Sequence, residues 1–130
     1  MRKKTLSKIY QALIDEKITL NAGWRTFTFQ FYEEILNSKG ESLDGETDFD
    51  GIIKLARCSD EHNSRVTLLH EIFHVITDSS GFGGDEHTDM VIPCTNEHLV
   101  DVISKGLLMY RTLNPRLFEI IFTEENNADN

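Results

Sequence analysis

Apolar residues recur along the chain at two spacings, which predict helices in some segments and strands in others. A first helix is predicted over residues 5–16, where apolar positions recur every three or four residues. After a turn at 21–23, phenylalanines alternate with polar residues over 26–31, which predicts a half-buried strand. The stretch 38–50 is rich in glycine and acidic residues and is expected to be a loop, and 52–57 to be a second, short strand.

A longer helix is predicted in the middle of the chain. Ser59 or Asp60 can cap its start, it runs to about Ser79, and Gly81 is its expected stop. It carries two apolar stripes, which predicts a central helix packed against more than one neighbour. The first stripe holds Val66, Leu69, Phe73 and Ile76, and the second holds Leu68, Ile72 and Val75.

The second half of the chain is predicted to be helical after a polar loop at 81–93. Thr95 can cap a helix that reaches about Leu113, and Asn114-Pro115 can start a short helix to Phe122. The residues 123–130 are polar and are expected to form a flexible tail. Helices and a small sheet in one chain predict an α+β domain over residues 1–122.

Composition narrows the class of protein. A chain of 130 residues suits one hydrophobic core, and 22 acidic against 13 basic residues give a formal net charge of -9. Such a charge disfavours binding to nucleic acid or to an anionic membrane. No apolar run approaches the roughly 18 residues of a membrane span. Cys58 and Cys94 form no CxxC pair and are expected to be reduced, so we expect a soluble cytoplasmic protein.

The predicted central helix contains the pattern HExxH at residues 70–74. Residues four apart lie on the same face of a helix, so the imidazoles of His70 and His74 can reach one metal ion. Neutral imidazole is a preferred ligand of Zn²⁺. Glu71 can then take a proton from a metal-activated water molecule instead of binding the metal itself.

A catalytic zinc needs a third protein ligand and one open coordination position. The metzincin spacing requires a histidine at position 80, which is Ser80 here, so that class is excluded. Glu97 and His87 are the remaining candidates. Glu97 is favoured because Asp101 follows it by one helical turn and can accept the N–H of a ligand histidine.

The pattern HExxH followed by Asn96-Glu97 and Asp101 resembles the gluzincin motif of the thermolysin-like peptidases, HExxH with NExxxD. This resemblance implies zinc ligands at His70, His74 and Glu97 and a general base at Glu71. It also implies that Asp101 orients the first histidine. Thermolysin-like enzymes carry a second helical domain whose histidine and tyrosine polarise the substrate carbonyl. A chain of this length is expected to lack it. The electrophile is left open: it is Tyr110, Arg111, His87 or His98, or it is absent.

The segment 45–122 is similar to short metallopeptidase-like proteins of phage and prophage genomes, related to the ImmA/IrrE type. The matching residues are the GETDFD stretch at 45–50, Leu68-Leu69 before HExxH, Leu107-Leu108, and Asn114-Pro115. The resemblance implies a phage protein that would act in the cytoplasm of the host cell.

Residues and resemblance together predict a minimal zincin-like domain, with a small twisted sheet packed on the HExxH helix and on a following helix that bears Glu97. The strand 52–57 is expected at the sheet edge above the metal, where an extended peptide could pair with it. The predicted function is zinc-dependent hydrolysis of a peptide or protein substrate. The alternative is a catalytically weak or inactive module of the same fold that binds a partner protein.

Overall fold

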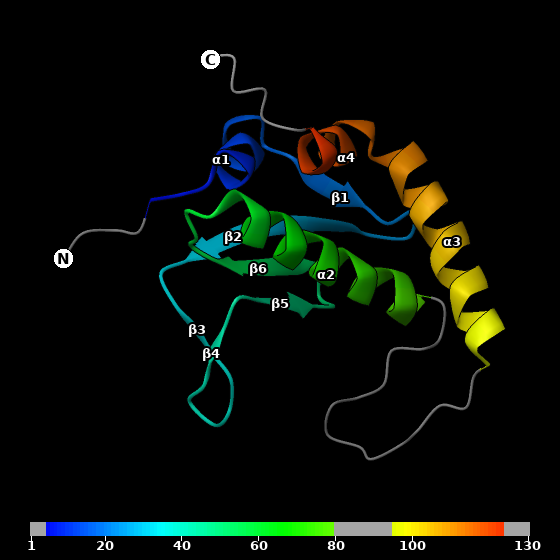
Figure 1. Ribbon diagram of the computed structural model, residues 1–130, viewed down its shortest axis with the longest axis horizontal. Helices are drawn as coiled ribbons and strands as arrows, with labels where there is room; N and C mark the ends of the chain where they lie inside the picture. Colours follow the sequence, from blue (N-terminus) through cyan, green and yellow to red (C-terminus); the bar gives the residue numbers. More distant parts are fainter. Residues whose placement is uncertain (1–4, 80–94, 124–130) are drawn as a thin grey trace.

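The computed structural model describes residues 5–79 and 95–123, which form helices packed against a mixed sheet (Figure 1). The predicted α+β class is confirmed. The helices are α1 (Lys8–Asp15), α2 (Glu61–Ser79), α3 (Asn96–Leu113) and α4 (Pro115–Phe122). The strands are β1 (Thr19–Asn21), β2 (Thr26–Tyr32), β3 (Ile35–Leu36), β4 (Ser42–Leu43), β5 (Gly45–Asp48) and β6 (Ile52–Ala56).

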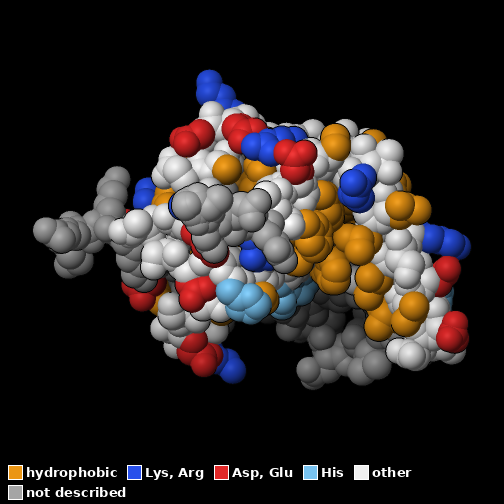
Figure 2. Space-filling view, turned by 45° about the horizontal axis from the view of Figure 1, so that its top comes forward, with side chains coloured by type: hydrophobic (Ala, Val, Ile, Leu, Met, Phe, Trp, Pro, Cys, Tyr) orange, Lys and Arg blue, Asp and Glu red, His pale blue; other side chains and the backbone are white. Residues whose placement is uncertain are grey.

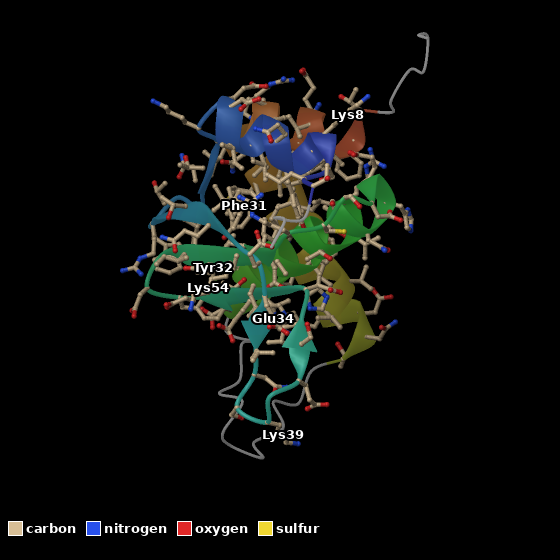
Figure 3. The ribbon with its side chains drawn as sticks, turned by 90° about the vertical axis from the view of Figure 1, so that its left-hand side faces the viewer. Lys8, Phe31, Tyr32, Glu34, Lys39 and Lys54 are labelled. Carbon is tan, nitrogen blue, oxygen red and sulfur yellow. The ribbon has the colours of Figure 1, made fainter. Side chains whose placement is uncertain are left out.

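The main sheet has the strand order β1-β2-β6-β5. β1 and β2 form an antiparallel hairpin, β2 runs parallel to β6, and β5 pairs antiparallel with β6 from Gly45 opposite Leu55 to Asp48 opposite Ile52. β3 and β4 form a separate two-stranded hairpin, with Lys39 near its tip (Figure 3). Among the described strands, β5 is therefore an edge of the main sheet.

Two sequence predictions about strands are wrong. The stretch 38–50 is not a continuous loop, because it contains β4 and β5, and the strand predicted at 52–57 lies inside the sheet rather than at its edge. Ile53 and Leu55 of β6 are fully buried, as a strand between two neighbours requires. The sequence of β5 is Gly-Glu-Thr-Asp. A polar sequence of this kind suits a strand that is paired on one side only and has little apolar surface to bury.

The hydrophobic core lies between the helices and one face of the sheet. The other face is open, because Thr26, Thr28, Gln30 and Tyr32 of β2 are exposed. In α2 the predicted stripe of Leu68, Ile72 and Val75 is fully buried and Ile76 joins it, whereas Val66 is exposed. α2 is thus the central helix, as predicted, and its apolar contacts are strongest on one stripe.

Capping fixes the ends of the helices close to the predicted residues. Asp60 Oδ1 accepts from the N–H of Asn63 at 2.9 Å at the start of α2, and Thr95 Oγ1 accepts from the N–H of His98 at 3.1 Å at the start of α3. α1 is shorter than predicted and begins after Ser7. Its N-terminus also receives a carboxylate from α2, because Glu61 accepts from the N–H of Lys8 at 2.7 Å.

The predicted loop at 81–93, with Gly81 and His87, lies outside the described residues, as do Cys94 and the tail from 124 onward. Within the described ranges no helix has the length and apolar composition needed to cross a membrane.

Asn114 joins the corner between α3 and α4 to the edge of the sheet. Its side-chain oxygen accepts from the N–H of Asn21 at 2.6 Å, and its Nδ2 donates to the carbonyls of Asn21 at 2.8 Å and of Tyr110 at 2.9 Å. The amide thus pairs with β1 as a neighbouring strand would. Since Asn114 is buried, these bonds exchange little with water.

We expect Asn114→Ala to lower the free energy of unfolding by about 2–4 kcal/mol, because it removes three hydrogen bonds and leaves the part-buried N–H and carbonyl of Asn21 without this partner. Urea denaturation measures this change. Thr112→Ala is the control, since Thr112 is exposed near the end of α3, two residues before Asn114. A loss in Asn114→Ala no larger than in Thr112→Ala would contradict this role.

Candidate metal centre

His70 and His74 lie one helical turn apart on the exposed face of α2. Their Nε2 atoms are 3.1 Å apart and their ring centroids 4.7 Å apart. The His70 side chain is 64% exposed, so solvent reaches the pair. Figure 2 shows a patch of histidine side chains on the surface. Both imidazoles therefore present a nitrogen to the same point outside the helix.

The spacing of the two nitrogens fits a shared zinc ion. Two imidazole nitrogens bound at about 2.0–2.1 Å to a tetrahedral Zn²⁺ lie about 3.3 Å from each other. The observed separation is 3.1 Å, reached with both rings on one continuous helix. The donor type and the spacing are compatible with zinc, for which His70 and His74 would be two of the ligands; without a metal, the same 3.1 Å is a hydrogen bond between the two Nε2 atoms.

Glu71 occupies a different environment from its neighbours. It is 4% exposed and points toward the sheet, with Oε2 4.0 Å from His70 Nε2. Because Glu71 is about one third of a turn from His70 on the helix, its carboxylate lies beside the histidine pair and not beyond it. An acid held next to two potential ligands can exchange a proton with a molecule bound between them.

Two residues of β5 surround the Glu71 carboxylate, and the sequence offered them only as part of the stretch 45–50, with no role at the site. Thr47 Oγ1 donates to Glu71 Oε1 at 2.8 Å. A Cβ atom on Gly45 would come within 3.2 Å of both Glu71 Cγ and Oε2. Thr47 lies 24 and Gly45 26 residues before Glu71 in the sequence, and the local sign of these contacts is that the segment 45–48 is too polar for a buried strand.

A groove runs along α2 beside this cluster. Next to His70 and Glu71 it has a volume of about 250 Å³ and is walled by β4, β5 and Val66. Leu43, Asp44 and Thr67 line this groove and also line a second, polar pocket of about 130 Å³. That pocket is lined by Tyr10, Glu33, Glu34, Ser42, Leu43, Asp44, Ala56, Arg57, Cys58, Asn63 and Thr67. A ligand at the histidines would therefore have the groove beside His70 and Glu71 open to it.

One residue of this polar pocket has a shifted pKa. Burial raises the pKa of Tyr10 well above its usual range, and the charges of Cys58 and Asp44 raise it further. The phenol, which is neutral at physiological pH even without this shift, keeps its proton and remains a hydrogen-bonding group.

The structure does not bring the other predicted site residues to the histidines. Glu97 is exposed in the first turn of α3, and Asp101 pairs with Lys105 at 3.0 Å. Over residues 5–79 and 95–123, no group of three or more His, Cys, Asp or Glu side chains is arranged to hold a metal ion. The third ligand therefore stays a prediction.

The predicted electrophiles that the structure describes lie on α3. Tyr110 is fully buried, and its hydroxyl is 3.1 Å from Ser79 Oγ. Arg111 lines a groove between α3 and α4. His98 is exposed in the first turn of α3. His87 lies outside the described residues.

Comparisons with models of protein families, with curated proteins and with solved structures gave no match for this chain.

Purified protein should hold about one zinc ion per chain, and His74→Ala should lose most of it because only one of the paired imidazoles remains. Zinc content after dialysis is measured by plasma emission spectroscopy. His62→Ala is the matched control, since His62 is an exposed histidine of the same helix. Equal zinc content in His74→Ala and in His62→Ala would contradict a metal centre at His70 and His74.

The third ligand can be identified from a graded series of zinc affinities. Glu97→Ala should weaken binding by orders of magnitude, Asp101→Ala by about 10–100-fold, and His87→Ala should bind like the parent, because a direct ligand contributes more than the group that orients it. Competition with a chromophoric chelator measures all three variants. A zinc loss in His87→Ala that is absent in Glu97→Ala would overturn the gluzincin ligand set.

Proposed function

We propose that this protein is a zinc-dependent peptidase in which Glu71 is the general base. The observation that supports this most directly is the placement of three ionisable groups on α2. Two exposed imidazole nitrogens lie 3.1 Å apart, and a carboxylate oxygen of a buried acid lies 4.0 Å from one of them. A helix with only a structural role has no need of a buried acid beside two solvent-facing histidines.

Zinc bound by His70 and His74 would supply a Lewis acid that polarises the substrate carbonyl and lowers the pKa of a water molecule. In this mechanism Glu71 accepts one proton from that water as its oxygen adds to the carbonyl carbon. Glu71 then returns the proton to the nitrogen of the leaving amine as the C–N bond breaks. The products are a carboxylic acid and an amine, and Glu71 ends in its starting state.

β5 is the part of the sheet that could align a peptide substrate. It is an edge strand of the main sheet among the described residues, and its Gly45 and Thr47 contact Glu71. An extended peptide can add to such an edge through main-chain hydrogen bonds, which bind it with little dependence on its sequence. We therefore assign to β5, residues 45–48, the pairing with an extended peptide that the sequence predicted for the strand at 52–57.

A second candidate function is binding of a partner protein without turnover. It is favoured by α3, where Tyr110 is the only buried residue, while Val100 is 51% and Leu108 68% exposed. Figure 2 shows hydrophobic side chains gathered on the surface. Large exposed apolar areas are often interaction sites.

Glu71→Gln separates the two functions. The amide cannot accept the water proton, so hydrolysis of a casein or peptide library by the zinc-loaded protein should fall by at least about 100-fold. Zinc content should stay at the parent level, because Glu71 is not expected to bind the metal.

Glu119→Gln makes the same chemical change at an exposed position of α4 and should retain the parent rate. Hydrolysis that continues unchanged in Glu71→Gln would exclude this mechanism. A zinc-loaded parent protein that cleaves nothing would favour the binding function.

A further inference from the structure

The hydroxyl of Thr47 is the closest polar contact that β5 makes with the buried acid of α2. Thr47 Oγ1 donates to Glu71 Oε1 at 2.8 Å and lies 3.4 Å from the main-chain carbonyl oxygen of the same residue. A hydroxyl has a single proton, and the shorter distance assigns it to the carboxylate. Glu71 is 4% exposed, so this bond replaces one that water would otherwise supply.

Gly45 limits the same carboxylate from the other side. Residues two apart on a strand face the same way, so positions 45 and 47 both face α2. A Cβ atom at position 45 would lie 3.2 Å from Glu71 Oε2 and 3.1 Å from the carbonyl oxygen of Lys54. β5 thus leaves space for one carboxylate oxygen at position 45 and donates to the other oxygen from position 47.

These contacts fix the direction of the Glu71 carboxylate. With Oε1 bonded to Thr47, Oε2 is the oxygen on the side of His70, 4.0 Å from its Nε2. We propose that Thr47 is a positioning residue, which holds Glu71 so that Oε2 faces the two histidines and is left to accept a proton. This inference rests on the proposed function, in which Glu71 is the general base.

The size of the expected effect follows from how strongly proton transfer depends on geometry. A misplacement of about 1 Å can cost about 100-fold in rate even though every catalytic group is present. Loss of the hydroxyl would let the carboxylate turn within its space and would leave Oε1 without its donor. The effect should appear in kcat, because the bond to Thr47 orients the base and does not touch the substrate.

The test compares Thr47→Val with Thr47→Ser in zinc-loaded protein. Valine keeps the β-branched shape without the hydroxyl, and serine keeps the hydroxyl without the methyl group. We expect Thr47→Val to lower kcat by about 10–100-fold with KM within about threefold of the parent, and Thr47→Ser to stay within about threefold in kcat. Thr26→Val, at an exposed position on the open face of the sheet, is the matched control and should behave as the parent.

A second readout does not depend on activity. In crystal structures of the zinc-loaded variants, Glu71 should keep its position in Thr47→Ser and should take another rotamer, or more than one, in Thr47→Val. An unmoved Glu71 in Thr47→Val would overturn the proposal. So would an equal loss of kcat in the valine and serine variants, or a loss carried by KM alone.

The failure of the proposed function would look different. Hydrolysis that survives Glu71→Gln shows that Glu71 is not the base, whatever the Thr47 variants do. A role of Thr47 in folding alone would lower the melting temperature of Thr47→Val relative to Thr47→Ser and leave Glu71 in place.

Discussion

The Glu71 carboxylate lies almost wholly out of water, and a buried charge is costly unless hydrogen bonds compensate for it. The compensation comes from the edge strand β5. Its Thr47 hydroxyl donates a hydrogen bond to the carboxylate, and Gly45, which has no side chain, leaves space for it. The position of β5 along α2 is therefore coupled to the acid, since a slip of one residue would turn both positions away. The groove beside the histidines exists because helix and strand meet in this register.

The rest of the fold keeps α2 in place for this contact. Its buried stripe packs on the sheet, and its two ends are tied to other helices through Glu61, which caps α1, and Ser79, which contacts Tyr110 of α3. Asn114 fastens the far end of α3 to β1. Contacts at its two ends set the position of α2. The three ionisable groups in its middle are therefore not needed to hold the helix in place.

Periodicity was sufficient to predict the helices and β2, because their apolar residues repeat at spacings typical of helix or strand. Periodicity did not predict β5, because its four residues are polar or glycine. It also could not place β6 inside the sheet, because that position depends on the pairing of β6 with β5. The histidine pair was predictable since both residues share one helix. The position of Glu97 was not, because α3 is placed by contacts of Gly106 and Tyr110, far along the helix from Glu97. Thr47 was missed because its partner is distant in sequence.

α3 is attached unevenly along its length, and this has a consequence for its dynamics. Tyr110 is buried, whereas nearly all side chains from Asn96 to Asp101 are exposed. The amide hydrogens near Tyr110 should exchange with solvent only when the whole domain unfolds. Those of the first turns should exchange through local fraying, which has a low free energy of opening. A metal ion that recruits Glu97 would have to suppress this fraying. Slowed hydrogen exchange confined to the start of α3 would thus report the completed metal site.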